Sequence, residues 1–285
     1  ARERLAAVRQ EVAKAVVGQD AAVSGLLVAL LCGGHVLMEG VPGTAKTLLV
    51  RTLAASLSVQ TRRVQFTPDL MPGDITGSMV IDTSGGAGGA GGQLSFREGP
   101  VFTNLLLADE INRTPPKTQS ALLEAMEEGQ VSVDGVTRRL PEPFLVAATQ
   151  NPVEYEGTYP LPEAQLDRFL LKVVLPIPER DAELEILTRH ASGFDPRDVA
   201  GAGVRAVAGA DDIAAGRRAV ATVQVTPEVA AYIVDIARAT RVSPSLSLGV
   251  SPRGATALLR AARAWAWLGG RDFVTPDPGE HRPRW

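Results

Sequence analysis

The chain has 285 residues, of which 45% are hydrophobic and 21% charged, a mixture typical of a folded globular protein. Its 29 basic and 32 acidic residues give a formal net charge of −3, which argues against a globally basic nucleic-acid binder. The single cysteine, Cys32, excludes an intrachain disulfide and a multi-cysteine metal site. The most apolar run, residues 21–32, is shorter than the roughly 20 residues that span a bilayer, and no leader precedes it. We therefore expect a cytoplasmic protein.

The first half of the chain alternates helical and strand patterns. Apolar residues recur at helical spacing over 4–16, and residues 21–31 have the composition of a more buried helix. A strand over 35–39 leads through a glycine-rich turn into a helix over 47–57. Further strand-length apolar runs, interleaved with helical patterns such as 116–127, occupy residues 64–67, 105–108, 144–149 and 171–175. This alternation predicts an α/β fold with a parallel sheet and helices on both faces.

Beyond Pro176-Ile177-Pro178 the pattern becomes entirely helical, over residues 179–190, 212–222, 226–241 and 251–268. The last two of these begin with a hydroxyl N-cap followed by proline, at Thr226-Pro227 and Ser251-Pro252. We expect an α/β core over residues 1–177 and a small all-α lid over 178–285.

Two segments of the predicted core are typical of hairpins. In both, β-type residues flank turn-forming residues, and the second contains an Asp-Gly turn. The sequence predicts that residues 77–100 and 130–140 form hairpins inserted into the core.

A phosphate-binding loop is indicated between the first predicted strand and the helix that follows it. Gly40-Val41-Pro42-Gly43-Thr44-Ala45-Lys46-Thr47 would present backbone N–H groups and a helix N-terminus to phosphates. Lys46 would reach the β- and γ-phosphate oxygens, and the Thr47 hydroxyl would bind Mg²⁺. Ala45 replaces the usual glycine, which a methyl group tolerates if the residue already has helical dihedrals. A glycine turn before a helix explains the glycines but not the Lys-Thr pair.

Two acids end the apolar strand at residues 105–108. Parallel strands present their carboxyl ends to the ligand crevice, so Asp109 could hold Mg²⁺ while Glu110 polarises the attacking water. The alternative is a solvated pair of acids that caps the next segment, but the nearby phosphate loop favours the catalytic interpretation.

Three further polar residues have positions that suit phosphoryl transfer. Asn151 follows a later strand, where it could position the water or contact the γ-phosphate, although Asn-Pro is also common in turns. Arg168 precedes a strand, where it could stabilise charge in trans or form a surface pair with Asp167. Arg253 lies in the first turn of a lid helix, a position that the helix dipole disfavours, and could bridge the lid and the phosphates.

Taken together, these residues resemble the AAA+ ATPases, and within them the MoxR family, over nearly the whole chain. The resemblance is carried by GHVLMEGVPGTAKT, QFTPDLMPGDITG, FREGPVFTNLLLADEINRTPPKTQSALLEAMEE, ATQNP, LPEAQLDRF and SPRGATALLRAARAWAWLGGRDFVTP, in this order. The alanine of GVPGTAKT is itself typical of the family. After residue 277 the chain lacks the further lid helix of the family, which implies a lid truncated at its C-terminus.

The resemblance implies a role for each candidate residue. Glu110 would act as catalytic base with Asp109 in the Walker B motif, Asn151 as sensor 1, Arg168 as arginine finger and Arg253 as sensor 2. The implied metal ligands for Mg²⁺ are Thr47 and Asp109. The implied nucleotide-binding residues are Val17, Gly18, Gln19, Gly40, Pro42, Gly43, Thr44, Ala45, Lys46, Thr47, Leu48 and Asp109.

The resemblance also implies a function: ATP hydrolysis with Mg²⁺, coupled to chaperone-like remodelling or maturation of partner proteins. Family members commonly form hexameric rings and work with von Willebrand factor A domain proteins. Related alternatives are a magnesium chelatase motor subunit or a nucleic-acid translocase, although the acidic balance makes a nucleic-acid partner the weaker expectation. A different class is a binding module that is gated by ATP and does not hydrolyse it.

Overall fold

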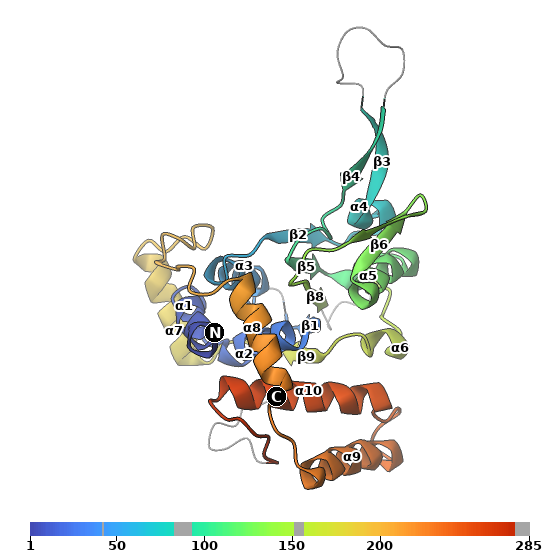
Figure 1. Cartoon of the computed structure of the whole chain (residues 1–285). Helices are drawn as coiled ribbons and strands as arrows, with labels where there is room; N and C mark the ends of the chain where they lie inside the picture. The colour runs from blue at the N-terminus through green and yellow to red at the C-terminus, as the bar shows by residue number, and fades with distance from the viewer. Residues whose placement is uncertain (42, 83–92, 151–156, 277–285) are drawn as a thin grey trace.

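The computed structural model describes residues 1–41, 43–82, 93–150 and 157–276. Its centre is a five-stranded parallel sheet in the order β2-β5-β8-β1-β9 (Figure 1). The strands are β1 Val36–Glu39, β2 Thr61–Gln65, β5 Leu105–Asp109, β8 Leu145–Gln150 and β9 Leu171–Val174. The α/β fold predicted from the sequence, a parallel sheet with helices on both faces and a helical lid, is confirmed.

The inner strands are apolar up to their polar carboxyl ends, because both faces of the sheet are covered. Leu105 and Leu107 belong to one buried cluster, whereas Leu106 and Ala108 belong to the other. The edge strand β2 begins at Thr61, three residues before the predicted strand, and includes the exposed Arg62 and Arg63. Edge strands tolerate polar side chains, so hydrophobicity alone did not find its start.

The helices divide between the two faces of the sheet. The cluster on one face joins α1, α2 and α3 to residues of the lid, and the cluster on the other face contains α5. Helix α2 is buried along most of its length because it contacts α1, α8, α10 and the sheet. The helices are α1 Arg2–Ala13, α2 Asp20–Cys32, α3 Lys46–Ser56, α4 Pro72–Thr76, α5 Pro116–Glu128, α6 Glu163–Leu166, α7 Arg180–Ala191, α8 Ala210–Ala221, α9 Pro227–Val242 and α10 Pro252–Leu268, with a 3-10 turn η1 at Ile111–Arg113.

Two antiparallel hairpins lie outside the central sheet, in the segments where the sequence predicts them. One pairs β3 Gly77–Asp82 with β4 Gln93–Glu98 and extends away from the body of the molecule (Figure 1). The other pairs β6 Gln130–Val133 with β7 Val136–Arg139 directly after α5. Residues 83–92 of the predicted first insert lie outside the described residues.

The last two lid helices begin where the sequence predicts, whereas α8 begins at Ala210, two residues before its predicted start. Val229 N donates to the Thr226 hydroxyl at the start of α9, and Gly254 N donates to the Ser251 hydroxyl at the start of α10. The boundary predicted after residue 177 falls in the connection between β9 and α7, and the predicted end of the lid beyond residue 276 is outside the described residues. In the described part of the chain, no helix is both long and apolar enough to span a membrane.

Candidate nucleotide-binding site

The predicted phosphate loop connects the carboxyl end of β1 to α3. Gly43 has a φ of +88°, a left-handed conformation that glycine adopts without strain. Ala45 also has a positive φ, +58°, so the condition under which its methyl group would be tolerated, helical dihedrals, is not met. Helix α3 begins at Lys46, one residue before the predicted start, and Ala45 is its N-cap. The methyl group of Ala45 therefore occupies a conformation that costs roughly 1–2 kcal/mol.

Lys46 is the first residue of α3 and lies half-buried at the mouth of the loop. Its ammonium group donates to the carbonyl oxygen of Gly40, within the same loop. Partial burial lowers the pKa of Lys46 below its ordinary value, while the charges of Asp109 and Glu110 act in the opposite direction. The loop and the two acids thus form one electrostatic unit, although they are more than 60 residues apart in the chain.

Asp109 ends β5 and is held by residues from both neighbouring strands. Arg63 of β2 donates to Asp109 Oδ2 from Nη2 at 2.7 Å and from Nε at 3.2 Å. The Thr149 hydroxyl of β8 donates to Asp109 Oδ1 at 2.6 Å and accepts from Glu110 N at 2.9 Å. No sequence motif marks Arg63, and only the strand order reveals its contact with Asp109, because β2 and β5 are neighbours in the sheet.

Glu110 follows β5 with a φ of +58°, a rare conformation for a glutamate. Its Oε2 lies 2.8 Å from Nε of Arg113, one turn further along the chain. This positive φ turns the chain sharply at the end of the strand, so that Glu110 lines the same pocket as Lys46 and Asp109.

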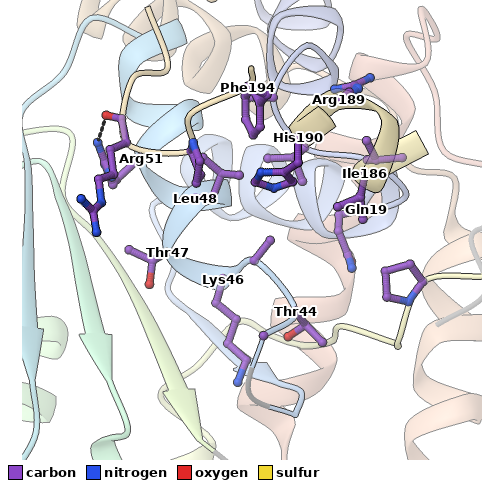
Figure 2. Close-up of a pocket in the computed structure, with 18 of the residues that line it drawn as sticks. Gln19, Thr44, Lys46, Thr47, Leu48, Arg51, Ile186, Arg189, His190 and Phe194 are labelled. Atoms are coloured by element: carbon purple, nitrogen blue, oxygen red, sulfur yellow. Dashed lines mark hydrogen bonds between the residues drawn. The ribbon is translucent and has the colours of Figure 1, made fainter. Parts of the chain in front are cut away.

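Around these residues lies a pocket of about 590 Å³, a size typical of small-molecule sites. Figure 2 shows Lys46 and Thr47 at the start of α3, with His190 and Phe194 near Leu48. The predicted residues that line the pocket are Val17, Gln19, Gly43, Thr44, Ala45, Lys46, Thr47, Leu48, Asp109 and Glu110. Gly18 and Gly40 belong to the same two segments without lining it, and Pro42 lies outside the described residues.

Another part of the pocket lining, which the sequence did not predict, combines apolar and aromatic side chains with Arg189 and Arg197. Ile186 and His190 of α7 and Phe194 after it line the pocket, and the rings of His190 and Phe194 meet edge to face at 5.4 Å. Gln19 donates to the carbonyl oxygen of Pro176, which links the segment before α2 to the connection before α7. Apolar and aromatic side chains beside a phosphate loop suit a nucleotide base. No motif marks these residues, although Ile186 and His190 lie in a predicted helix.

The two predicted arginines lie elsewhere. Arg168 and Arg253 line a separate hollow of about 360 Å³, and neither lines the pocket around Lys46. Glu127 of α5 pairs with both of them, with its Oε2 3.1 Å from Arg168 Nε and its Oε1 3.1 Å from Arg253 Nη1. In this chain Arg253 therefore lies apart from the phosphate loop, and its predicted contact with phosphates stays a prediction. Asn151 lies outside the described residues.

The donor set at the mouth of the loop fits a magnesium ion that is held mainly by phosphates. Thr47 offers a hydroxyl oxygen and Asp109 a carboxylate, the hard oxygen donors that Mg²⁺ prefers. Among the described residues there is no group of three or more His, Cys, Asp or Glu side chains that could hold a metal by themselves. This arrangement suits Mg²⁺ bound by one or two protein ligands together with a nucleotide.

Family models of known proteins match both the α/β core and the helical lid of this chain. A family model described as "ATPase family associated with various cellular activities (AAA)" matches residues 35–171, and an AAA lid domain model matches residues 238–278. The chain is 50% identical to protein YeaC of Bacillus subtilis, over 88% of this chain and 75% of that protein. It is 43% identical to Chaperone MoxR1 of Mycobacterium tuberculosis, over 94% of this chain and 70% of that protein.

Two further similarities cover almost the whole chain. Protein MoxR of Methylorubrum extorquens is 34% identical over 97% of this chain and 84% of that protein. A crystal structure from Cytophaga hutchinsonii, of a protein described as a candidate ATPase, superposes with a TM-score of 0.85 at 41% identity. The match covers 97% of this chain and 83% of that one.

Proposed function

Because the chain belongs to the MoxR family of AAA+ ATPases, we propose that it binds Mg-ATP in the pocket around Lys46 and hydrolyses it to ADP and phosphate. The pocket supports this proposal: a phosphate loop at a helix N-terminus, a lysine and two acids line one side, and an apolar wall lines the other. Lys46 would contact the β- and γ-phosphate oxygens. The nucleotide base of ATP would lie between the segment around Gln19 and the side chains of Ile186 and His190.

Bound Mg²⁺ would neutralise charge that develops on the phosphates. Thr47 and Asp109 would hold it, and Arg63 and Thr149 would keep the Asp109 carboxylate in place through the contacts described above. Each carboxylate oxygen has more than one lone pair, so these hydrogen bonds leave room for a further ligand.

Glu110 would act as the base that orients the attacking water. A carboxylate at hydrogen-bond distance from a water can accept its proton as the bond to phosphorus forms. In this structure the carboxylate is paired with Arg113, so Glu110 would exchange Arg113 for the water during turnover. Asn151, by the family resemblance, would contribute a second polar contact to the water or the γ-phosphate.

The observation that carries the proposed mechanism is the separation between the pocket and the two arginines. Arg168 and Arg253 line a hollow of their own, apart from the phosphate loop of the same chain. An arginine that is to stabilise transition-state charge must reach the γ-phosphate. We therefore place Arg168 and Arg253 of one subunit at the nucleotide of the next, in a closed ring of identical subunits, which the family resemblance makes a hexamer.

We also propose that ATP hydrolysis is coupled to mechanical work on a partner protein. One relative is named a chaperone, and two antiparallel hairpins lie outside the central sheet, where they would contact a client. Hydrolysis would move the lid and the hairpins relative to the core. The chain would act in this way on a protein client, together with a von Willebrand factor A domain partner.

The experiment is steady-state ATPase activity, measured over a wide range of protein concentration. Activity per subunit should rise with concentration, because the site is complete only in the assembly. Glu110→Gln should bind ATP with the wild-type Kd and turn it over at least about 100-fold more slowly. Normal turnover by Glu110→Gln would show that the base is another residue, and constant specific activity from monomer to assembly would exclude the arginines in trans.

A further inference from the structure

Glu127 and Arg253 both occupy the unfavourable end of a helix. Glu127 lies in the last turn of α5, where the helix dipole repels an anion, and this turn has no basic residue of its own. Arg253 lies in the first turn of α10, where the dipole repels a cation. The C-terminal end of α5 and the N-terminal end of α10 meet, so each charge also faces the favourable end of the opposite helix.

The carboxylate of Glu127 divides its two oxygens between two arginines. Its Oε1 lies 3.1 Å from Arg253 Nη1, and its Oε2 lies 3.1 Å from Arg168 Nε. The three side chains come from α5, from the turn after α6 and from α10, segments that are far apart in the sequence. One carboxylate thus brings the guanidinium groups of the core and the lid into a single cluster.

The ion pair with Glu127 involves Nε of Arg168 and not its two terminal nitrogens. Glu127 approaches it through Nε, and within the described residues no hydrogen bond of its terminal Nη groups is found. Arg168 is partly exposed and Arg253 is half-exposed, and both line the same hollow as Glu127. A phosphate group that entered this hollow could accept from the terminal nitrogens of Arg168 without displacing Glu127.

The backbone next to Glu127 is held in place by a buried histidine. The carbonyl oxygen of Met126, the preceding residue, lies 3.0 Å from Nε2 of the buried His35, and His35 Nδ1 accepts from Val146 N at 3.0 Å. In front, the Ser251 hydroxyl at the start of α10 donates to Asp167 at 3.1 Å. The end of α5 is therefore tied to the sheet, and the start of α10 is tied to the turn that carries Arg168.

We infer that Glu127 is a positioning residue, which holds Arg168 and Arg253 side by side so that both reach the same phosphate of a nucleotide bound by a neighbouring copy of this chain. The inference rests on the proposed function. Without the carboxylate, two adjacent guanidinium groups repel each other and regain rotamer freedom. Ion pairs at this exposure contribute little to folding, so the effect falls on turnover more than on stability.

The test is Glu127→Gln, which keeps the size of the side chain and removes its charge. We expect kcat to fall between about 10- and 100-fold, the range that a misplacement of about 1 Å can cause, while KM and the melting temperature stay at wild-type values. Glu127→Asp keeps the charge on a side chain one methylene shorter and should give an intermediate kcat. The control is Glu128→Gln, the adjacent exposed carboxylate, which should leave kcat unchanged.

A double-mutant cycle with Arg253→Ala separates positioning from an independent role. If Glu127 acts through Arg253, then Glu127→Gln costs less in the Arg253→Ala background than in the wild type. Additive losses, or a kcat of Glu127→Gln within twofold of wild type, would overturn the inference while an active wild-type enzyme upheld the proposed function. A wild-type chain that hydrolyses no ATP at any concentration would overturn both.

Discussion

The nucleotide pocket and the arginine cluster differ in how much of a phosphoryl-transfer site each contains. The pocket has the phosphate loop, Lys46 and the acids Asp109 and Glu110, all close to one another. The cluster has Arg168 and Arg253 around Glu127, in a separate hollow that contains no part of the phosphate loop. The pocket has the features that hold a nucleotide, and the predicted arginines lie in the other region.

This difference is the basis of our proposal that the reactive site is composite. In that proposal each hollow on one chain is half of a site, and a complete site would need the pocket of one copy and the arginines of another. The charges of the two regions also differ, because Asp109 and Glu110 act on Lys46 in the pocket, whereas one carboxylate pairs with two arginines in the cluster. Substitutions in the two regions should therefore have different signatures, which the following predictions use.

Lys46→Ala should have the largest effect, because it removes the cation that contacts the phosphates and so abolishes both binding and turnover. Fluorescent-nucleotide titration should show at least about 100-fold weaker binding, and ATPase activity should fall to background. The control is Lys117→Ala, an exposed lysine on α5. Binding that survived in Lys46→Ala would mean that the pocket does not hold the phosphates as described.

Arg168→Ala should have the opposite signature. Nucleotide affinity stays at the wild-type value, because Arg168 does not line the pocket of its own chain, whereas kcat falls by about 1,000-fold or more. Arg180→Ala, at a highly exposed arginine, is the control. Parallel titration and steady-state kinetics check the prediction, and a large loss of affinity in Arg168→Ala would place this arginine at its own nucleotide.

Ala45→Gly tests whether the positive φ at this position strains the phosphate loop. Glycine relieves the strain of the positive φ, a gain of roughly 1–2 kcal/mol, and costs part of this in unfolded-state entropy. We expect a net stabilisation of about 0.5–1 kcal/mol in chemical denaturation. Ala55→Gly, inside α3, should instead destabilise, because glycine is unfavourable in a helix. Equal destabilisation by both substitutions would refute strain at Ala45.

The pH dependence of stability tests the support beneath Glu127. Burial lowers the pKa of His35 to about 4, below its ordinary value near 6.5. Between these values the unfolded chain binds more protons, so His35 contributes stability above pH 6.5 that is lost as the pH falls toward 4. His35→Gln should flatten this part of the stability profile by on the order of 1 to 3 kcal/mol. Parallel profiles for the two proteins would contradict a neutral His35 in the folded state.

The pocket was largely predictable from the sequence, and the cluster was not. A phosphate loop is continuous in the chain, and Asp109 and Glu110 end a recognisable strand, so their meeting follows from the parallel sheet. Arg63 and Glu127 depend on which segments become neighbours in space. A polar edge strand and a carboxylate in the last turn of a helix have no local signal that distinguishes them from surface residues.

Arg253 shows that a sequence can mark an unusual residue without revealing the partner of that residue. Its unfavourable place in a helix N-terminus was visible in the sequence, and so was the inference that it has a functional reason. Its partner was not, because the sequence does not reveal that the lid brings this helix end to α5 and not to the phosphate loop. Ala45 is a smaller example, since the sequence does not reveal that the residue directly before α3 has a left-handed backbone conformation.

Mixing two inactive variants tests the composite site most directly. Arg168→Ala keeps an intact pocket, and Glu110→Gln keeps an intact arginine cluster, so each is inactive alone for a different reason. In mixed assemblies the cluster of a Glu110→Gln subunit can complete the pocket of an Arg168→Ala neighbour. We expect ATPase activity in the mixture well above the sum of the separate proteins. A mixture that is no more active than that sum would contradict a site shared between two copies of the chain.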